Sequence, residues 1–166
     1  MSGTVLVGLD GSTASAQALA WAWDFARATG RSVRVVHTWR GDPAQVYEPL
    51  AEIRRDEERR ARQEAEEWMA AAVIDDSSVR WSLEVADGPP GRRLVAAAAK
   101  EEDCVLVVGT HEHHGLGRVL HGSISHYVLS HADCPVVAVP PPRPELVTVY
   151  PDPSDKAVGE LHVPRF

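Results

Sequence analysis

The sequence predicts an α/β domain with one doubly wound, five-stranded parallel sheet in the strand order 3-2-1-4-5 and helices on both faces. Two short runs, residues 4–9 and 104–108, are almost entirely apolar, which is typical of strands buried on both faces of a parallel sheet. Strand patterns alternate with helical patterns, so each strand leads into a right-handed crossover helix. The 166 residues are enough for one domain with a sizeable core.

The first predicted strand, residues 4–9, ends in an Asp-Gly-Ser turn. Ser12 or Thr13 can cap the helix that follows, and Gly30 stops that helix after Thr29. Its inner face consists of apolar residues at helical spacing, which are Leu19, Ala22, Trp23 and Ala26. Residues 32–38 then predict the second strand.

A charge-rich stretch over residues 51–72 predicts a long helix whose charged face is solvated. Its other face carries five apolar residues, Ile53, Ala61, Ala65, Trp68 and Ala72. Residues 79–85 alternate between apolar and polar side chains, which predicts a half-exposed strand at a sheet edge. After a Gly-Pro-Pro break, an alanine-rich stretch over residues 91–101 predicts the third helix.

Residues 104–108 predict a buried fourth strand, residues 123–131 the fourth helix and residues 135–139 the fifth strand. The two fully apolar strands, the first and the fourth, should be neighbours at the centre of the sheet. Asp10 follows the first of them and Gly109 ends the other. Because ligands in such sheets bind where the winding reverses, outside the carboxyl ends of the strands, both residues should border one crevice.

The stretch from Gly109 to Ser125 has the pattern of an anion site. Ser123 is a good N-cap, and the free N–H groups of Ser123, Ile124 and Ser125 would face a ligand at the positive end of the helix dipole. Three better-known patterns are absent from the sequence: the Walker phosphate loop, the dinucleotide fingerprint and the Gly-x-Ser-x-Gly nucleophile elbow. The stretch therefore indicates phosphate binding by a different motif.

Composition excludes several classes of function. The formal net charge of −7 and the pI near 5.6 argue against a nucleic-acid-binding surface, which needs a basic face. No apolar run approaches the roughly 18 residues of a membrane span. Neither an apolar leader nor a disulfide framework is indicated, and two cysteines fit a reducing compartment, so we expect a cytoplasmic protein.

Residues 141–166 form a proline-rich tail to the predicted domain, residues 1–140. Eight of the 12 prolines lie from Pro135 onward, and the tail is polar apart from residues 146–150. Such a segment cannot build a second core.

The domain resembles the universal stress protein family over roughly residues 4–139. The matching segments are Val7-Gly8-Leu9-Asp10-Gly11-Ser12, Val107-Val108-Gly109, Gly122-Ser123-Ile124-Ser125-His126 and Ala132-Asp133-Cys134-Pro135-Val136. The resemblance implies a Rossmann-like fold, a homodimer, and a stress-response regulatory module rather than an enzyme. The family includes members that bind ATP and members that do not.

The family's nucleotide motif is a glycine, two residues, a second glycine, nine residues, and then glycine with serine or threonine. Here Gly109 and the pair Gly122-Ser123 keep the spacing, but Glu112 stands where the motif has its second glycine. The resemblance implies a site for ATP, with Mg²⁺ as a possible companion, made of Leu9, Asp10, Val36, Gly109, His111, Arg118, Gly122, Ser123, Ile124 and Ser125. Two alternatives stay open: a member without nucleotide that acts through protein contacts, and a slow ATP hydrolase.

Histidines and cysteines allow further interpretations. His111, His113, His114 and His121 lie close in sequence, with Glu112 among them. They form either a polar loop with titratable side chains or a zinc site. Cys104 and Cys134 begin neighbouring strands, where they are either small core residues or a redox-linked pair. The fifth strand is an apolar edge, through which we expect two chains to pair as a homodimer.

We predict that ATP binds weakly, at micromolar affinity or worse, and that Glu112→Gly tightens binding about tenfold, roughly 1.4 kcal/mol. Glycine adopts positive φ freely and brings backbone N–H groups onto phosphates, whereas glutamate brings a negative charge. At a separation of about 4 Å and an effective dielectric near 20, the repulsion between the Glu112 carboxylate and one phosphate charge costs on the order of 4 kcal/mol, less if the side chain turns into water. Arg118 is the one formally cationic side chain from Gly109 to Ser125, so Arg118→Ala should loosen binding. Calorimetry checks both variants; tighter binding by the wild type than by Glu112→Gly would make Glu112 a ligand, through a metal ion.

Overall fold

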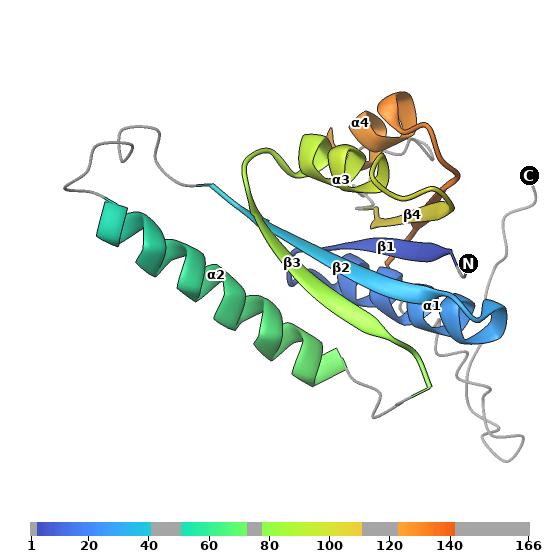
Figure 1. Ribbon diagram of the computed structural model, residues 1–166, viewed down its shortest axis with the longest axis horizontal. Helices are drawn as coiled ribbons and strands as arrows, with labels where there is room; N and C mark the ends of the chain where they lie inside the picture. The colour runs from blue at the N-terminus through green and yellow to red at the C-terminus, as the bar shows by residue number, and fades with distance from the viewer. Residues whose placement is uncertain (1–2, 41–50, 73–77, 111–122, 142–166) are drawn as a thin grey trace, which may run out of the picture.

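All five strands of the computed structural model run parallel in one sheet, in the order β3-β2-β1-β4-β5 (Figure 1). The predicted fold class and strand order are confirmed. The structure describes residues 3–40, 51–72, 78–110 and 123–141. The elements are β1 (Thr4–Leu9), α1 (Thr13–Thr29), β2 (Ser32–Trp39), α2 (Ala51–Ala72), β3 (Trp81–Asp87), α3 (Pro90–Ala98), β4 (Cys104–Gly109), α4 (Ser123–His131) and β5 (Val136–Val139).

The helices form a layer on each face of the sheet, α1 and α2 on one side and α3 and α4 on the other (Figure 1). Successive residues of a strand point to opposite faces, so β1 serves both layers. Val5 and Val7 pack with Trp23 of α1, while Leu6 packs with Leu94 of α3 and Leu106 of β4. The predicted inner face of α1 is buried as expected.

Several element boundaries and one expected core residue differ from the sequence prediction. The third strand runs over Trp81–Asp87 rather than residues 79–85, although Val79 is buried in the core beside it. Helix α3 begins at Pro90 and ends at Ala98 rather than Glu101. There the amide of Glu101 donates to the carbonyl of Ala98 at 3.0 Å, a tighter i→i+3 turn that is common at helix ends. On α2, Ile53 is 46% exposed, whereas Ala61, Ala65 and Met69, farther along the helix, are buried.

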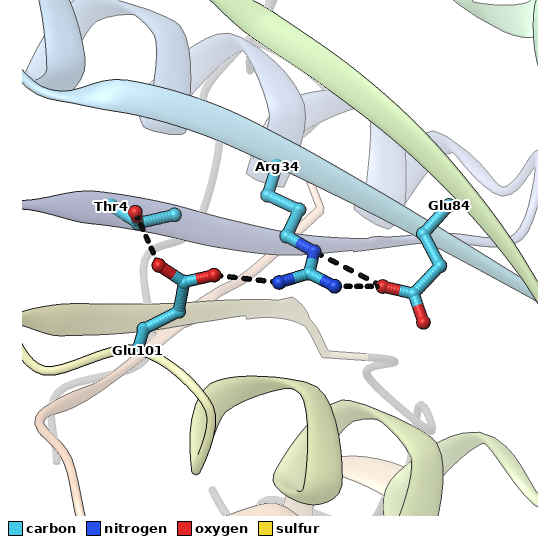
Figure 2. A network of polar contacts seen from close by, with 4 residues as sticks. All are labelled: Thr4, Arg34, Glu84 and Glu101. Carbon is cyan, nitrogen blue, oxygen red and sulfur yellow. Dashed lines mark hydrogen bonds and ion pairs between the residues drawn. The ribbon is translucent and has the colours of Figure 1, made fainter.

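An ionic network lies on the α3 side of the sheet, toward the amino ends of the strands (Figure 2). The guanidinium group of Arg34 donates to Glu84 Oε2 at 2.5 and 3.0 Å and to Glu101 Oε1 at 2.6 Å. The hydroxyl of Thr4 donates to the other oxygen of Glu101 at 2.8 Å. Burial by itself lowers the pKa of Arg34, but the hydrogen bonds and charges of both glutamates outweigh it and raise that pKa. The network therefore links β1, β2, β3 and the segment before β4 at the end of the sheet away from the predicted crevice.

Candidate functional site

A cavity of about 410 Å³ opens at the carboxyl ends of β1, β2 and β4, where the sequence predicts a crevice. The described residues that line it are Gly8, Leu9, Asp10, Ser12, Ser15, Val36, Thr38, Pro90, Leu94, Val108, Gly109, Ser123, Ile124 and Ser125. Seven of the ten predicted site residues are among them: Leu9, Asp10, Val36, Gly109, Ser123, Ile124 and Ser125. The other three, His111, Arg118 and Gly122, lie outside the described residues, as does Glu112.

The turn between β1 and α1 forms one wall of the cavity. A carboxylate oxygen of Asp10 accepts from the amide of Ser12 at 3.0 Å, which makes an Asx turn. The hydroxyl of Ser12 accepts from the amide of Ser15 at 3.1 Å, so Ser12 is the N-cap of α1, one of the two residues predicted for that role. Ser15 in turn donates its hydroxyl to the carbonyl of Ser12 at 2.9 Å. These bonds fix the carboxylate of Asp10 beside the start of the helix.

Gly11 lets this turn fit under α2. Its φ of +76° is in the left-handed region, and a Cβ there would lie 2.6 Å from the indole of Trp68. The same indole meets the ring of His37 edge-on, with the centroids 5.2 Å apart. His37 Nδ1 lies 2.9 Å from the carbonyl oxygen of Leu9, so the imidazole holds the last residue of β1. Helix α2 thus supports the turn from the side away from the cavity.

Gly109 ends β4 against the backbone of α1. A Cβ at this position would lie 2.6 Å from the carbonyl carbon of Ala14 and 2.8 Å from the amide nitrogen of Ser15. Backbone cannot move aside as a flexible side chain does, so the position requires glycine for steric reasons. Thr110 follows and is 3% exposed; its amide donates to the carbonyl of Val139 at 2.8 Å.

Helix α4 forms the opposite wall of the cavity with its first turn. Ser123 is the first described residue of the helix, and the residues before it lie outside the described part of the chain, so its capping role stays a prediction. Ser125 is 1% exposed, and Ile124 packs against the core on the α3 side of the sheet. The first N–H groups of a helix have no partner within it, so this wall offers donors at the positive end of the helix dipole.

Sequence reasoning predicted Val36 but missed the rest of the cavity floor, which consists of Val108, Thr38, Pro90 and Leu94. Thr38 lies two residues beyond Val36 and therefore on the same face of β2. Pro90 and Leu94 are four residues apart on α3 and share one helix face. Because side chains alternate between the two faces of β2, the sequence could have predicted Thr38 from Val36. The contribution of α3 depends on where the crossover places that helix.

Two kinds of feature are absent from the described part of the chain. Within the described residues, no three His, Cys, Asp or Glu side chains lie close enough to hold a metal ion. The loop histidines His111, His113, His114 and His121 lie outside those residues, so the zinc interpretation stays untested. None of the described helices is long and apolar enough to cross a membrane.

Comparison with known proteins gives the family. The profile of the universal stress protein family matches residues 1–140. The chain belongs to the universal stress protein family. A universal stress protein of Thermus aquaticus is 31% identical over 136 residues, which cover 82% of this chain and 97% of the relative. The predicted family resemblance is therefore confirmed.

Solved structures of universal stress proteins share the fold. UspA from Lactobacillus plantarum superposes with a TM-score of 0.63 at 24% identity, covering 82% of this chain and 97% of its own. A universal stress protein in complex with cAMP has a TM-score of 0.54 at 24% identity, with coverage of 82% and 95%. One from Archaeoglobus fulgidus in complex with dAMP has a TM-score of 0.51 at 17% identity, with coverage of 84% and 98%.

We predict that Gly109→Ala lowers the free energy of unfolding by about 2–3 kcal/mol, because the methyl group must push β4 away from the first turn of α1. Gly8→Ala is the matched control, since Gly8 also lines the cavity from a central strand. Its Cβ would meet only the end of the Leu94 side chain, at 3.1 Å, and the expected cost is below about 1 kcal/mol. Urea unfolding measures both; equal losses would contradict the steric role of Gly109.

Proposed function

We propose that this universal stress protein binds an adenine nucleotide, ATP among them, in the cavity between β1 and β4, as a regulatory module rather than an enzyme. The observation that carries the proposal is the division of one cavity into an apolar floor and two walls made by helix starts. Its volume of about 410 Å³ lies in the range of small-molecule sites. A nucleotide has the same two chemical halves, an apolar ring system and an anionic phosphate.

The apolar floor suits the flat faces of a purine. Val36, Val108 and Leu94 present aliphatic side chains, and all three are at most 3% exposed, so their positions are fixed by packing. Pro90 adds a rigid ring at the start of α3. Thr38 supplies a hydroxyl, which both donates and accepts, at the edge of this surface.

Phosphate would lie between the first turns of α1 and α4. Both helix starts line the cavity, through Ser12 and Ser15 on one side and residues Ser123 and Ser125 on the other. The positive ends of both helix dipoles favour an anion. The carboxylate of Asp10 accepts hydrogen bonds, which suits ribose hydroxyls or a Mg²⁺ ion and not a bare phosphate. Residues His111, Arg118 and Gly122 remain part of the proposed site on the strength of the sequence motif.

The solved relatives support this placement of function. The cAMP and dAMP complexes are universal stress proteins of the same fold, and both ligands are adenine nucleotides. Adenine is the part that these ligands share with ATP. Under this proposal the adenine ring binds the apolar floor, and the ligands that bind can differ in their number of phosphate groups.

We predict that ATP, cAMP or both raise the unfolding temperature while GTP does so less, since a ligand that binds only the folded state must stabilise it. A ligand at about 100 times its Kd contributes roughly 2.7 kcal/mol, or about 5–10 °C for a chain of this size. Asp10→Ala should weaken binding about tenfold in calorimetry. Asp103→Ala, an acidic residue beyond the opposite end of the sheet, should leave it unchanged. No shift with any adenine nucleotide would remove the proposal in favour of a member that acts through protein contacts.

We also propose that the chain forms a homodimer through β5. Among the described elements, β5 pairs only with β4, and all four of its residues are half-buried. The carbonyl of Pro135 accepts from the amide of Leu106 in β4 at 2.9 Å, and the carbonyl of Val139 accepts from the amide of Thr110, just after β4, at 2.8 Å. Because alternate residues of a strand direct their N–H and C=O groups to opposite sides, those of Val136 and Ala138 face the open edge. A second copy related by a two-fold axis could pair there antiparallel.

We predict that Ala138→Pro converts the dimer to a monomer, because proline removes the outward N–H group that the partner strand would bind. The bonds from β5 to β4 use the neighbouring residues and are kept, so the variant should still fold. Sedimentation at micromolar concentration measures the association, and circular dichroism checks the fold. A folded variant that remains dimeric would place the interface elsewhere.

A further inference from the structure

The two cysteines of the chain lie side by side at the amino ends of β4 and β5. Cys104 is the first residue of β4, and Cys134 lies two residues before β5. The strand register pairs Leu106 with Val136, so each cysteine stands two residues before the same pair. The amide of Leu106 donates to the carbonyl of Pro135 at 2.9 Å, which holds the two segments together at this point.

This backbone spacing suits a disulfide. Neighbouring strands lie about 4.8 Å apart, and bridged cysteines have Cα atoms roughly 4.4–6.8 Å apart. Both thiols are free in the structure. Cys104 is 5% exposed and packs in the core under α3, whereas Cys134 is half-buried. The pair therefore combines one partly exposed cysteine with one that is buried.

The surroundings give the two thiols different reactivity. A groove of about 290 Å³ is lined by both cysteines and by four acidic residues, Glu101, Glu102, Asp103 and Asp133. Burial raises the pKa of Cys104 to about 12, with further contributions from the charge and hydrogen bond of the Cys134 thiol and from the charge of Glu101. Cys104 is thus a protonated thiol at neutral pH, in contact with its neighbour, and is not the group that reacts first.

We propose that Cys104 and Cys134 are a modification site, at which a hydroperoxide converts the two thiols into a reversible intramolecular disulfide. The accessible Cys134 reacts with the oxidant, and the buried Cys104 resolves the product. Neither cysteine lines the nucleotide cavity, so this site is independent of the proposed function.

The chemistry balances with the hydroperoxide as the only co-reactant. The thiolate of Cys134 attacks the O–O bond, which breaks, and leaves Cys134 as a sulfenic acid while the alkoxide or hydroxide takes up a proton. The sulfur of Cys104 then attacks the sulfenic sulfur, the S–O bond breaks, and the Cys104 proton leaves with the hydroxide as water. Two thiols and one hydroperoxide give one disulfide, one alcohol or water, and one further water.

The acidic groove selects the class of oxidant. Arg31 and Arg34 pair with Asp103 and Glu101 respectively, but Glu102 and Asp133 add two further carboxylates to the lining. Anionic disulfides such as oxidised glutathione are repelled by this field, whereas a neutral hydroperoxide is not. We therefore assign the site to a small neutral peroxide rather than to thiol–disulfide exchange with an anionic partner.

The bridge would close a segment that borders the nucleotide cavity. Residues 104–134 contain β4 and α4, which supply Gly109 and Ser125 to the cavity walls. A cross-link between the ends of this segment restricts its unfolded conformations and ties the edge strand β5 to the sheet. Oxidation should therefore stabilise the part of the fold that carries half of the cavity.

The test treats the full-length wild type with a few equivalents of hydrogen peroxide and counts thiols with Ellman's reagent after denaturation. We expect both thiols to be lost together, the mass of the single chain to fall by two hydrogen atoms, and dithiothreitol to restore the starting state. The same treatment in urea should form the disulfide at least tenfold more slowly, because the unfolded chain does not hold the pair together. Equal rates in the folded and unfolded states would overturn the proposal.

Two variants separate the roles of the cysteines. In Cys104→Ser, the sulfenic acid on Cys134 has no resolving partner, so dimedone should trap it. In Cys134→Ser, the buried Cys104 should keep its thiol under the same exposure. Oxidised glutathione should react at least tenfold more slowly than hydrogen peroxide with the wild type. A wild type that ends with sulfinic acid on Cys134 and a thiol on Cys104, or as covalent dimers, would also overturn the proposal.

Discussion

The close approach of Gly109 to the first turn of α1 is the constraint on which the cavity depends. Because no side chain stands between them, the end of β4 lies against the backbone of Ala14 and Ser15. The start of α1 is therefore held beside the gap between β1 and β4, where the winding of the sheet reverses. A larger residue would push the helix start outward and open the site to water. One missing Cβ thus places two backbone segments where they can share a ligand.

The two ends of the sheet carry different kinds of polar group. At the amino end, the charged groups of Arg34, Glu84 and Glu101 satisfy one another and fix the positions of the strands (Figure 2). At the carboxyl end, the described lining of the cavity contains a single charged side chain, Asp10. The rest of that lining consists of hydroxyl groups, backbone and apolar side chains. A site of this kind can accept an anion without a large cost of burying a cation.

The sequence predicted the fold well because its strongest signals are local. The apolar runs of β1 and β4 have no polar face to place in water, so they must be central. The ends of β3 and α3 were harder: Val79 continues the alternation although the ladder starts at Trp81, and the alanine-rich stretch has no residue that stops a helix at Ala98. Site residues at strand ends followed from the topology. Pro90 and Leu94 did not, because the position of α3 over the cavity is set by packing and not by any motif.

The distribution of polar groups also indicates what a ligand would be selected by. In the described lining, the groups that would face an anion are the positive ends of two helix dipoles, with four serines, Ser12, Ser15, Ser123 and Ser125, at the two helix starts. Helix dipoles favour a phosphate but distinguish poorly between phosphate groups of different charge, because they carry only partial charges. The aliphatic floor around Val36 and Leu94 has a fixed shape, since both side chains are buried and packed. Under the proposed function, shape complementarity to the purine therefore sets specificity, and the phosphate end sets orientation.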